Sequence, residues 1–275
     1  MAAPIALSFS GGKDSVLALA ALRGALGRDV RRLLATVNED DGTLVMHAVP
    51  GELLERQAAS LGVPLLQVAV PRQPTNETYE SRMAAALARL AVEDIAEVAF
   101  GDLFLPDVRA YRDAMLARAG FAGVYPLWGR ETRALAEEFR RAGYRAVAVC
   151  VDTERLSGTF AGRDLDRSFF DDLPASVDPC GEHGEFHSFV YDGPGFAFPV
   201  RFARRTEPVA GRFRRCHLEP LPATRCARCG APFECGMASG LNACWCTTRP
   251  PVRTIDPAVG CFCPRCLAAA AGSAS

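Results

Sequence analysis

The sequence predicts an α/β protein built on a doubly wound, mainly parallel sheet, followed by a small β-containing part and a cysteine-rich tail. Three observations support this fold class. Short apolar runs alternate with helical segments over about the first 150 residues, a glycine-rich loop (SGGKDS) follows the first run, and eight of the 11 cysteines lie between Cys226 and Cys266. Strand–helix alternation is typical of a doubly wound sheet, in which the residues just after the strands form the ligand site.

Five apolar runs have the length and composition of buried parallel strands, and they cover residues 4–10, 31–38, 65–70, 97–102 and 145–152. Helical segments are expected at 14–26, 51–62, 76–94, 107–120 and 131–143. Several of them begin near Ser, Asp, Asn or Glu and end on Gly, as capped helices do. The residues that follow the strands are therefore candidate ligand contacts: Ser10 to Ser15, Asn38, and Gly101 with Asp102.

Composition and charge exclude several classes of protein. The chain has 275 residues, a formal net charge of −1, 49% hydrophobic residues and 23% charged residues, which is globular composition and argues against a wholesale nucleic-acid binder. No apolar run reaches the roughly 18 residues that span a bilayer, and the start lacks the basic segment of a signal peptide. We therefore expect a cytoplasmic protein with no membrane partner, whose cysteines are metal ligands or free thiols rather than disulfides.

The distribution of prolines and cysteines divides the chain. A proline-marked stretch, LEPLPATR, precedes the cysteine-rich segment and places a boundary near Pro222. We expect one domain over residues 1–221, with about 1–152 binding the ligand and 153–221 forming a substrate subdomain. The cysteine-rich domain would cover 222–268, and the small, polar-tipped end at 269–275 would be a flexible tail.

The loop after the first strand has the composition of a phosphate-binding loop. Two glycines let the backbone approach an anion, the start of a helix offers free N–H groups, and Lys13, the only lysine among 31 basic residues, adds a compact charge. Asp14 has a role beside phosphates if it holds Mg²⁺. The loop matches neither the Walker A pattern nor the GxGxxG dinucleotide pattern. The simpler alternative is a glycine turn that merely joins strand to helix.

A second dense stretch, DPCGEHGEFHSFVYDGP, starts at Asp178 and places Glu182, Glu185 and His187 around two glycines. Two carboxylates three residues apart, with imidazoles nearby, have the chemistry to bind Mg²⁺ or to act as acid and base. A polar surface loop that leads into a strand explains the same residues equally well.

Both stretches resemble one known family. The SGGKDS loop resembles the PP-loop of ATP pyrophosphatases of the adenine nucleotide α-hydrolase-like type, and the second stretch resembles the DPCGENGEFHTFVYDGP signature of the diphthine–ammonia ligase branch. GDLF, YPLW, LERQAASLGVPL, NETYE and VDTERLSGTFAGRDLD resemble further segments of that family, over roughly residues 4 to 200. This chain differs in having His183 where Asn is usual and Ser188 where Thr is usual.

The resemblance implies a Rossmann-like PP-loop fold and a set of functional residues. The leaving pyrophosphate would be held by Ser10, Gly11, Gly12, Lys13, Asp14 and Ser15. Asp102, beside Gly101, would contact metal or nucleotide, and Asn38 and His47 would line the adenosine side. Glu182, Glu185 and His187 would face the acceptor or the incoming ammonia. Strand-end Asp and Asn residues also commonly cap turns, and a lone histidine is commonly a packing residue.

The eight cysteines of the tail predict a metal centre. The segment is too small for a good apolar core, so zinc bound by thiolates would supply the missing folding energy. One or two sites would be formed by Cys226, Cys229, Cys235, Cys244, Cys246, Cys261, Cys263 and Cys266. Disulfides and a labile Fe–S cluster are the alternatives. The Cys244–Trp245–Cys246 triplet resembles the small cysteine-rich CWC domain, which implies metal and no particular activity.

The resemblance implies an ATP-dependent ligase that adenylates a carboxylate, releases pyrophosphate and forms an amide with ammonia. The family reaction converts diphthine on translation elongation factor 2 to diphthamide, but the acceptor is left open here as a carboxylate on a small molecule or a protein. ATP, Mg²⁺ and zinc are the expected cofactors. A tRNA-modifying PP-loop enzyme and a non-catalytic nucleotide sensor are the alternatives. Nucleic acid binding is possible but not favoured, because the basic cluster between Arg201 and Arg215 has the pattern of a solvated strand face.

Overall fold

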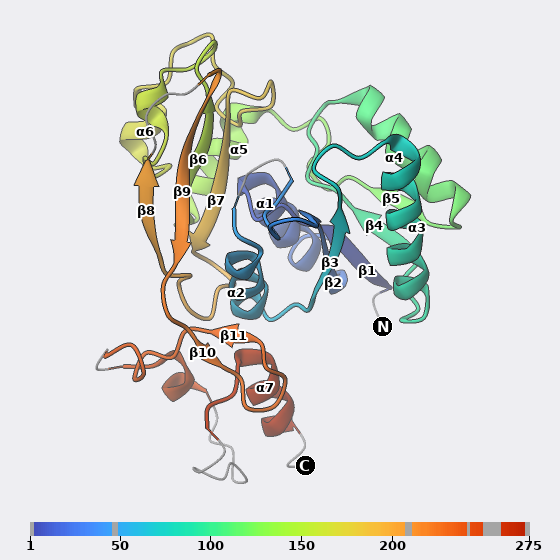
Figure 1. Cartoon of the computed structure of the whole chain (residues 1–275), viewed down its shortest axis with the longest axis vertical. Coiled ribbons are helices and arrows are strands. Elements are labelled where there is room, and N and C mark those ends of the chain that lie inside the picture. The colour runs from blue at the N-terminus through green and yellow to red at the C-terminus, as the bar shows by residue number, and fades with distance from the viewer. Residues whose placement is uncertain (1–2, 46–48, 207–210, 241–242, 250–259, 273–275) are drawn as a thin grey trace.

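The computed structural model describes residues 3–45, 49–206, 211–240, 243–249 and 260–272 (Figure 1). The first sheet has five parallel strands in the order β3-β2-β1-β4-β5. Its strands are β1 (Pro4–Ser8), β2 (Asp29–Asn38), β3 (Leu65–Val70), β4 (Glu97–Ala99) and β5 (Ala122–Val124). The chain builds outward from β1 to β3 and then returns to place β4 on the other side of β1. The switch in strand order therefore lies between β1 and β4, where ligands bind in open α/β sheets.

Helices cover both faces of the parallel sheet. They are α1 (Lys13–Arg23), α2 (Gly51–Leu61), α3 (Asn76–Ala91), α4 (Pro106–Arg118) and α5 (Thr132–Arg141). On one face, α3 and α4 contribute residues such as Leu87 and Leu116 to a core cluster that includes Leu34 and Val98 of the sheet. The helices α1, α2 and α5 belong to the larger core cluster of the opposite face. All five helices lie within one or two residues of the predicted starts, and the doubly wound α/β class is confirmed.

A second, antiparallel sheet follows in the order β7-β6-β9-β8. Its strands are β6 (Arg145–Asp152), β7 (Phe186–Asp192), β8 (Phe202–Thr206) and β9 (Phe213–Pro220), with the short helices η1 (Gly158–Phe160) and α6 (Arg167–Asp171) in the connection between β6 and β7. The larger core cluster contains residues of both sheets, for example Leu7 and Phe189, so the two sheets are packed around shared apolar contacts.

The prediction that residues 145–152 form a parallel strand is wrong. This segment is β6, which pairs antiparallel with β7 and with β9. Seven of its eight residues are buried because neighbours cover both faces, and such a strand has the same continuous apolar sequence as a parallel one. The fifth parallel strand is instead β5, whose three residues (Ala-Gly-Val) are too few to give a strand signal.

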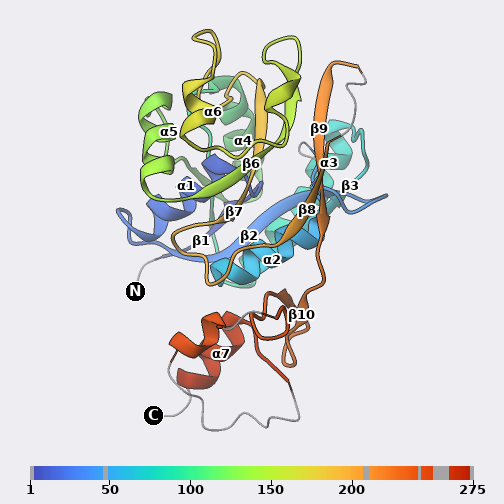
Figure 2. The ribbon, with the colours of Figure 1, turned by 90° about the vertical axis from the view of Figure 1, so that its left-hand side faces the viewer.

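The cysteine-rich tail lies below α2 (Figures 1 and 2) and contains β10 (Thr224–Arg225), β11 (Pro232–Phe233), η2 (Trp245–Thr248) and α7 (Pro264–Gly272). The strands β10 and β11 form a two-stranded antiparallel ladder, and α2 packs against β11 and α7. The buried cluster of the tail consists of cysteines with Phe198 and Phe233, which is a small apolar core. No helix within the described ranges combines the length and the apolar character that crossing a bilayer requires.

Candidate active site

The glycine loop lies at the switch point between β1 and β4 and leads directly into α1. Gly11 has φ +72°, and a Cβ atom there would lie 2.6 Å from Oε1 of Gln57 and 2.9 Å from Cδ1 of Leu54. Only glycine therefore fits this position without strain. The N–H of Gly12 donates to Oγ of Ser10 at 3.3 Å, and Oγ of Ser15 donates to the Gly12 carbonyl at 2.8 Å, which fixes the loop at the start of the helix.

Lys13 is buried, with 1% of its surface exposed, and its ammonium group forms an ion pair with Asp14. Burial opposes the charge on Lys13, but the carboxylate of Asp14 outweighs it, so the pKa of Lys13 is raised. The lysine is therefore a fixed cation at the start of α1, close to the helix N–H groups. A cation and a helix N-terminus together favour a phosphate ligand.

The end of β4 approaches the same loop. A Cβ atom on Gly101 would lie 3.0 Å from the backbone carbonyl carbon and oxygen of Asp14, so glycine allows the two segments to come this close. Asp102 forms an ion pair with Arg112 of α4, whose guanidinium lies over the Phe100 ring at 4.5 Å. Arg112 was not predicted from the sequence, since only the register of α4 on the sheet brings it to the strand end.

The second motif reaches the loop from the antiparallel sheet. Oγ of Ser188, on β7, accepts a hydrogen bond from the N–H of Lys13 at 3.2 Å. The Cys180 thiol donates to the Thr132 carbonyl at 3.2 Å, and burial raises its pKa to about 12 although Lys13 lowers it, so Cys180 stays a neutral thiol. Neither residue was assigned a role from the sequence. Both lie far along the chain from the loop, Ser188 being 175 residues from Lys13, so no local pattern pointed to the contact.

Among the candidate acid–base groups of the motif, Glu182 and His187 have shifted pKa values. Burial, reinforced by the negative charges of Asp14 and Asp178, raises the pKa of Glu182 to about 7. Burial also lowers the pKa of His187, although Asp14 opposes this shift. At neutral pH the carboxyl group of Glu182 is therefore poised to exchange a proton, and the imidazole of His187 is neutral.

Glu185 lies in a different place from the one expected. Its carboxylate is 2% exposed and accepts the N–H of Asp178 at 3.1 Å and the N–H of His183 at 3.0 Å, and it does not line the cavity described below. The side chain points into its own loop because these two N–H groups would otherwise be buried without a partner. Glu185 thus holds the loop that carries Glu182.

The loop, the β4 end and the second motif enclose one cavity of about 400 Å³. Of the predicted residues, those that line it are Ser10, Gly12, Lys13, Asp14, Ser15, Gly101, Asp102, Glu182 and His187. A second cavity of about 190 Å³ adjoins it through Ser8, Ser10, Phe100 and Arg112 and is lined mainly by apolar residues of β2, α3 and α4.

Of the two residues predicted on the adenosine side, Asn38 and His47, the structure describes only Asn38. Asn38 lines neither cavity, and its Nδ2 donates to Oγ1 of Thr43 at 2.8 Å across the turn after β2. This strand-end asparagine therefore stabilises a turn. His47 lies outside the described residues.

The tail contains a four-thiolate cluster that fits a zinc ion. The Sγ atoms of Cys226, Cys229, Cys263 and Cys266 all lie within 4.8 Å of one another, and those of Cys229 and Cys263 are 3.7 Å apart. A tetrahedral zinc ion with Zn–S bonds of about 2.3 Å requires S···S distances of about 3.8 Å. The two CxxC pairs predicted from the sequence therefore converge as one metal site.

The remaining four tail cysteines lie in a second group. Cys261 contacts Cys235, and Cys246 contacts Cys244. The N–H of Gly236 donates to Sγ of Cys244 at 3.3 Å. This group is more open than the first one, because its sulfur atoms do not all lie within 4.8 Å of one another, as those of the first group do.

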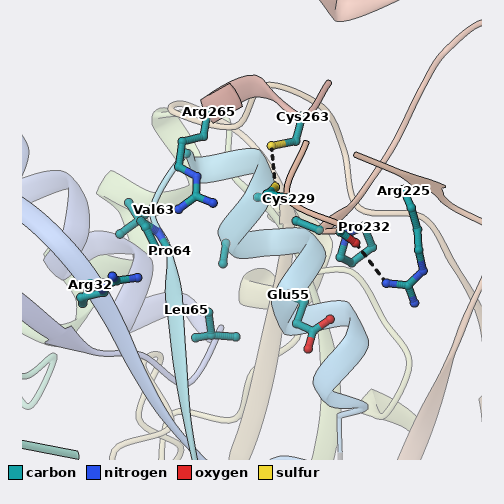
Figure 3. Close-up of a pocket in the computed structure, with 15 residues that line it drawn as sticks. Arg32, Glu55, Val63, Pro64, Leu65, Arg225, Cys229, Pro232, Cys263 and Arg265 are labelled. Carbon is teal, nitrogen blue, oxygen red and sulfur yellow. Dashed lines mark hydrogen bonds between the residues drawn. The ribbon is translucent and has the colours of Figure 1, made fainter. Parts of the chain in front are cut away.

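The tail and α2 enclose a third cavity of about 370 Å³ (Figure 3). Arg225 of β10 and Arg265 of α7 lie on opposite sides of α2 in this view, with Glu55 of α2 between the tail and the sheet. Each of these arginines has a partner: Arg225 donates to the Gly230 carbonyl at 3.2 Å, and Arg265 contacts Cys229 of the metal cluster.

Fold and site together define a doubly wound α/β protein with a glycine loop and a buried lysine facing a cavity at the sheet switch point. Residues 3–122 match the family model "Diphthamide synthase N-terminal domain", residues 131–209 match "Diphthamide synthase C-terminal domain", and residues 226–268 match "Cysteine-rich CWC". No curated protein matches the chain. The chain belongs to the diphthamide synthase family, extended by a CWC domain, and this family membership makes it an ATP-utilising enzyme of the PP-loop type.

Proposed function

We propose that the protein is an ATP-dependent ligase that activates a carboxylate as an acyl-adenylate and forms an amide with ammonia. The observation that supports this best is that the phosphate loop and the second motif line one cavity, directly joined by the hydrogen bond from Lys13 N–H to Ser188. Nucleotide phosphates and an acceptor carboxylate would therefore meet in the same space. Such proximity is what a two-substrate condensation requires.

The loop would hold the part of ATP that leaves. The acceptor carboxylate oxygen attacks the α-phosphorus, the bond to the β-phosphate oxygen breaks, and pyrophosphate departs with its electron pair. Lys13 and the first N–H groups of α1 stabilise the charge that grows on this leaving group. Asp14 and Asp102 would hold the Mg²⁺ that accompanies ATP, and the ion would neutralise phosphate charge. The adjoining 190 Å³ cavity has the apolar lining that an adenine ring needs.

The second motif would handle the ammonia step. Nitrogen attacks the acyl carbon, AMP leaves, and one proton must be removed from the attacking nitrogen. Glu182, with its pKa near 7, is the group that accepts this proton, and His187, kept neutral by burial, can hold the acceptor by a hydrogen bond. We assign Glu185 a positioning role, since its carboxylate is used by two backbone N–H groups of the loop.

A tRNA-modifying activity has weaker support in the geometry. The basic cluster of β8 and β9 is partly neutralised, because Arg204 pairs with Asp164, Arg205 with Glu219 and Arg212 with Asp152. Paired arginines attract a phosphate backbone less than free ones do.

The test is pyrophosphate release from ATP by the purified protein, with ammonium and a panel of carboxylates, including diphthine-containing elongation factor. The expected result is pyrophosphate release that requires the carboxylate, continues beyond one turnover only when ammonium is present, and is lost in Lys13→Ala. No release under any condition would contradict the ligase and leave a nucleotide sensor as the better function. Release stimulated by tRNA instead of ammonium would show the modifying enzyme.

A further inference from the structure

The helix α2 lies between the phosphate loop and the cysteine-rich tail (Figures 1 and 2). It presents a buried polar side chain to each. Gln57 is 0% exposed and faces the loop, whereas Arg56 is 1% exposed and faces the tail. Two adjacent buried polar residues on one helix are unusual, because each must find hydrogen-bond partners away from water. The partners of these two residues connect two distant parts of the chain.

On the loop side, Gln57 holds the base of the phosphate loop. Its Nε2 donates to the Gly11 carbonyl at 3.0 Å and to the Val190 carbonyl of β7 at 2.6 Å. The N–H of Val190 donates to the same Gly11 carbonyl at 2.9 Å. The position of Gly11, two residues before Lys13, is therefore set jointly by α2 and by the strand that carries His187 and Ser188.

On the tail side, Arg56 pairs with Glu234. Nη1 of Arg56 lies 3.0 Å from Oε1 of Glu234, and the two side chains are 2% and 6% exposed. The second partner of Arg56 is Glu52, which is 43% exposed and thus weakened by solvent. Glu234 is therefore the main carboxylate that compensates the buried positive charge of Arg56. If Glu234 moved away, Arg56 would carry an uncompensated buried charge, and α2 could not keep its position unchanged.

The position of Glu234 depends in turn on the metal cluster. Glu234 directly follows β11, at the end of the β10–β11 hairpin whose turn contains Cys226 and Cys229, and its carbonyl accepts the indole N–H of Trp245 at 2.8 Å. A metal ion would join this turn to the start of α7 through Cys263 and Cys266. The apolar core of the tail is small, so a bound metal would add much of the energy that holds the hairpin, and Glu234 with it, in place.

We propose that the metal centre of the tail controls the phosphate loop through α2. When the metal is bound, Glu234 stays in contact with Arg56 and α2 keeps its position. Gln57 of α2 then holds Gly11, so that Lys13 is positioned for the ligand. Loss of the metal releases Glu234, shifts α2 and loosens the loop. The inference rests on the proposed function only in taking ATP as the ligand of the loop.

The experiment measures the affinity for a non-hydrolysable ATP analogue by calorimetry. The samples are zinc-loaded protein, zinc-depleted protein, Glu234→Gln, and Glu219→Gln as a matched control. Glu219 also pairs with an arginine, but it is 58% exposed and its partner, Arg205, lies on β8 and not on α2. Zinc depletion and Glu234→Gln should each weaken binding by roughly 5- to 150-fold, the usual range of coupling between sites. Glu219→Gln should bind as the unaltered protein does.

Two further measurements separate this inference from the proposed function. Amide hydrogen exchange at residues 10–15, recorded without nucleotide, should be faster after zinc depletion and in Glu234→Gln. Unchanged exchange in both samples would overturn the coupling, whether or not ATP is the ligand. The ATP analogue should also slow the transfer of zinc to a chelator, because coupling between two sites is reciprocal. One result would keep the ATP site and refute the coupling. In that result the unaltered protein binds the analogue and Lys13→Ala does not, while zinc depletion and Glu234→Gln both leave the affinity unchanged.

Discussion

Replacing Gly11 by alanine tests how closely the phosphate loop is packed against α2. The new Cβ atom would lie 2.6 Å from Oε1 of Gln57 and 2.9 Å from Cδ1 of Leu54, and the residue would keep a φ of +72°. The left-handed backbone costs about 1–2 kcal/mol for a residue with a Cβ atom. Crowding in a packed interior adds about 1–3 kcal/mol. We therefore expect Gly11→Ala to lower the free energy of unfolding by about 2–5 kcal/mol.

Gly27→Ala is the matched control, because Gly27 has φ +55° but no atom within 4 Å of the new Cβ. It carries the backbone cost of about 1–2 kcal/mol without the crowding. Thermal melts should show a decrease in Tm of about 2–8 °C for Gly27→Ala and of about 4–20 °C for Gly11→Ala, using about 2–4 °C per kcal/mol for a chain of this size. Equal Tm values for the two variants would refute the close packing of the loop on Gln57.

Three further predictions concern the chemistry. Lys13→Arg should abolish most pyrophosphate release, because a bulkier, planar guanidinium replaces a buried ammonium (1% exposed). Crowding of about 1–3 kcal/mol should lower Tm by about 2–12 °C without unfolding the protein. Full activity would show that the lysine is not required. At a fixed concentration of unprotonated ammonia, amide formation should rise with pH through about 7 as Glu182 ionises, and Glu182→Gln should remove this dependence. Since its pKa is raised on folding, Glu182 favours the folded state below pH 4.5 and loses that contribution as pH rises through 7, so Glu182→Gln should raise Tm at pH 8 but not at pH 4. The full chain should bind two zinc ions by elemental analysis. Cys263→Ser, in the first cysteine group, and Cys246→Ser, in the second, should each lose one ion. A single ion that is lost only in Cys263→Ser would show that the second cysteine group binds no metal.

The phosphate loop and the tail cluster could be predicted because each is encoded locally. A glycine pair between a strand and a helix, and CxxC pairs in a short segment, restrict the backbone and the ligand chemistry within a few residues. The contacts that join the loop to the second motif are not local: Lys13 and Ser188 are 175 residues apart in the chain. No pattern in either segment predicts that the loop and the second motif are in contact. Only the resemblance to a family indicates that they belong to one site.

The errors also have physical causes. β6 was placed in the parallel sheet because a strand buried on both faces gives the same apolar run in either kind of sheet. Glu185 was expected at the substrate because its sequence position does not show which N–H groups it must satisfy. Gln57 did leave a signal, since it occupies a core position on α2 in line with Leu53, Leu54 and Leu61. A polar residue in such a stripe is buried, and buried amides need partners.

The charges around Glu182 give the proposed reaction an order. Asp14 raises the pKa of this carboxyl group and Lys13 lowers it, so the pKa follows the net charge beside the loop. A bound polyphosphate adds negative charge next to Lys13. To the extent that the accompanying Mg²⁺ leaves this charge uncompensated, it should raise the pKa of Glu182 and favour the protonated carboxyl group while ATP is present. Departure of pyrophosphate removes that charge and lets the carboxyl group ionise, at the step where a proton has to be taken from the attacking nitrogen. Under the proposed function, the phosphate loop therefore delays the base until the acyl-adenylate has formed, and the pKa of Glu182 followed by NMR should rise on addition of pyrophosphate.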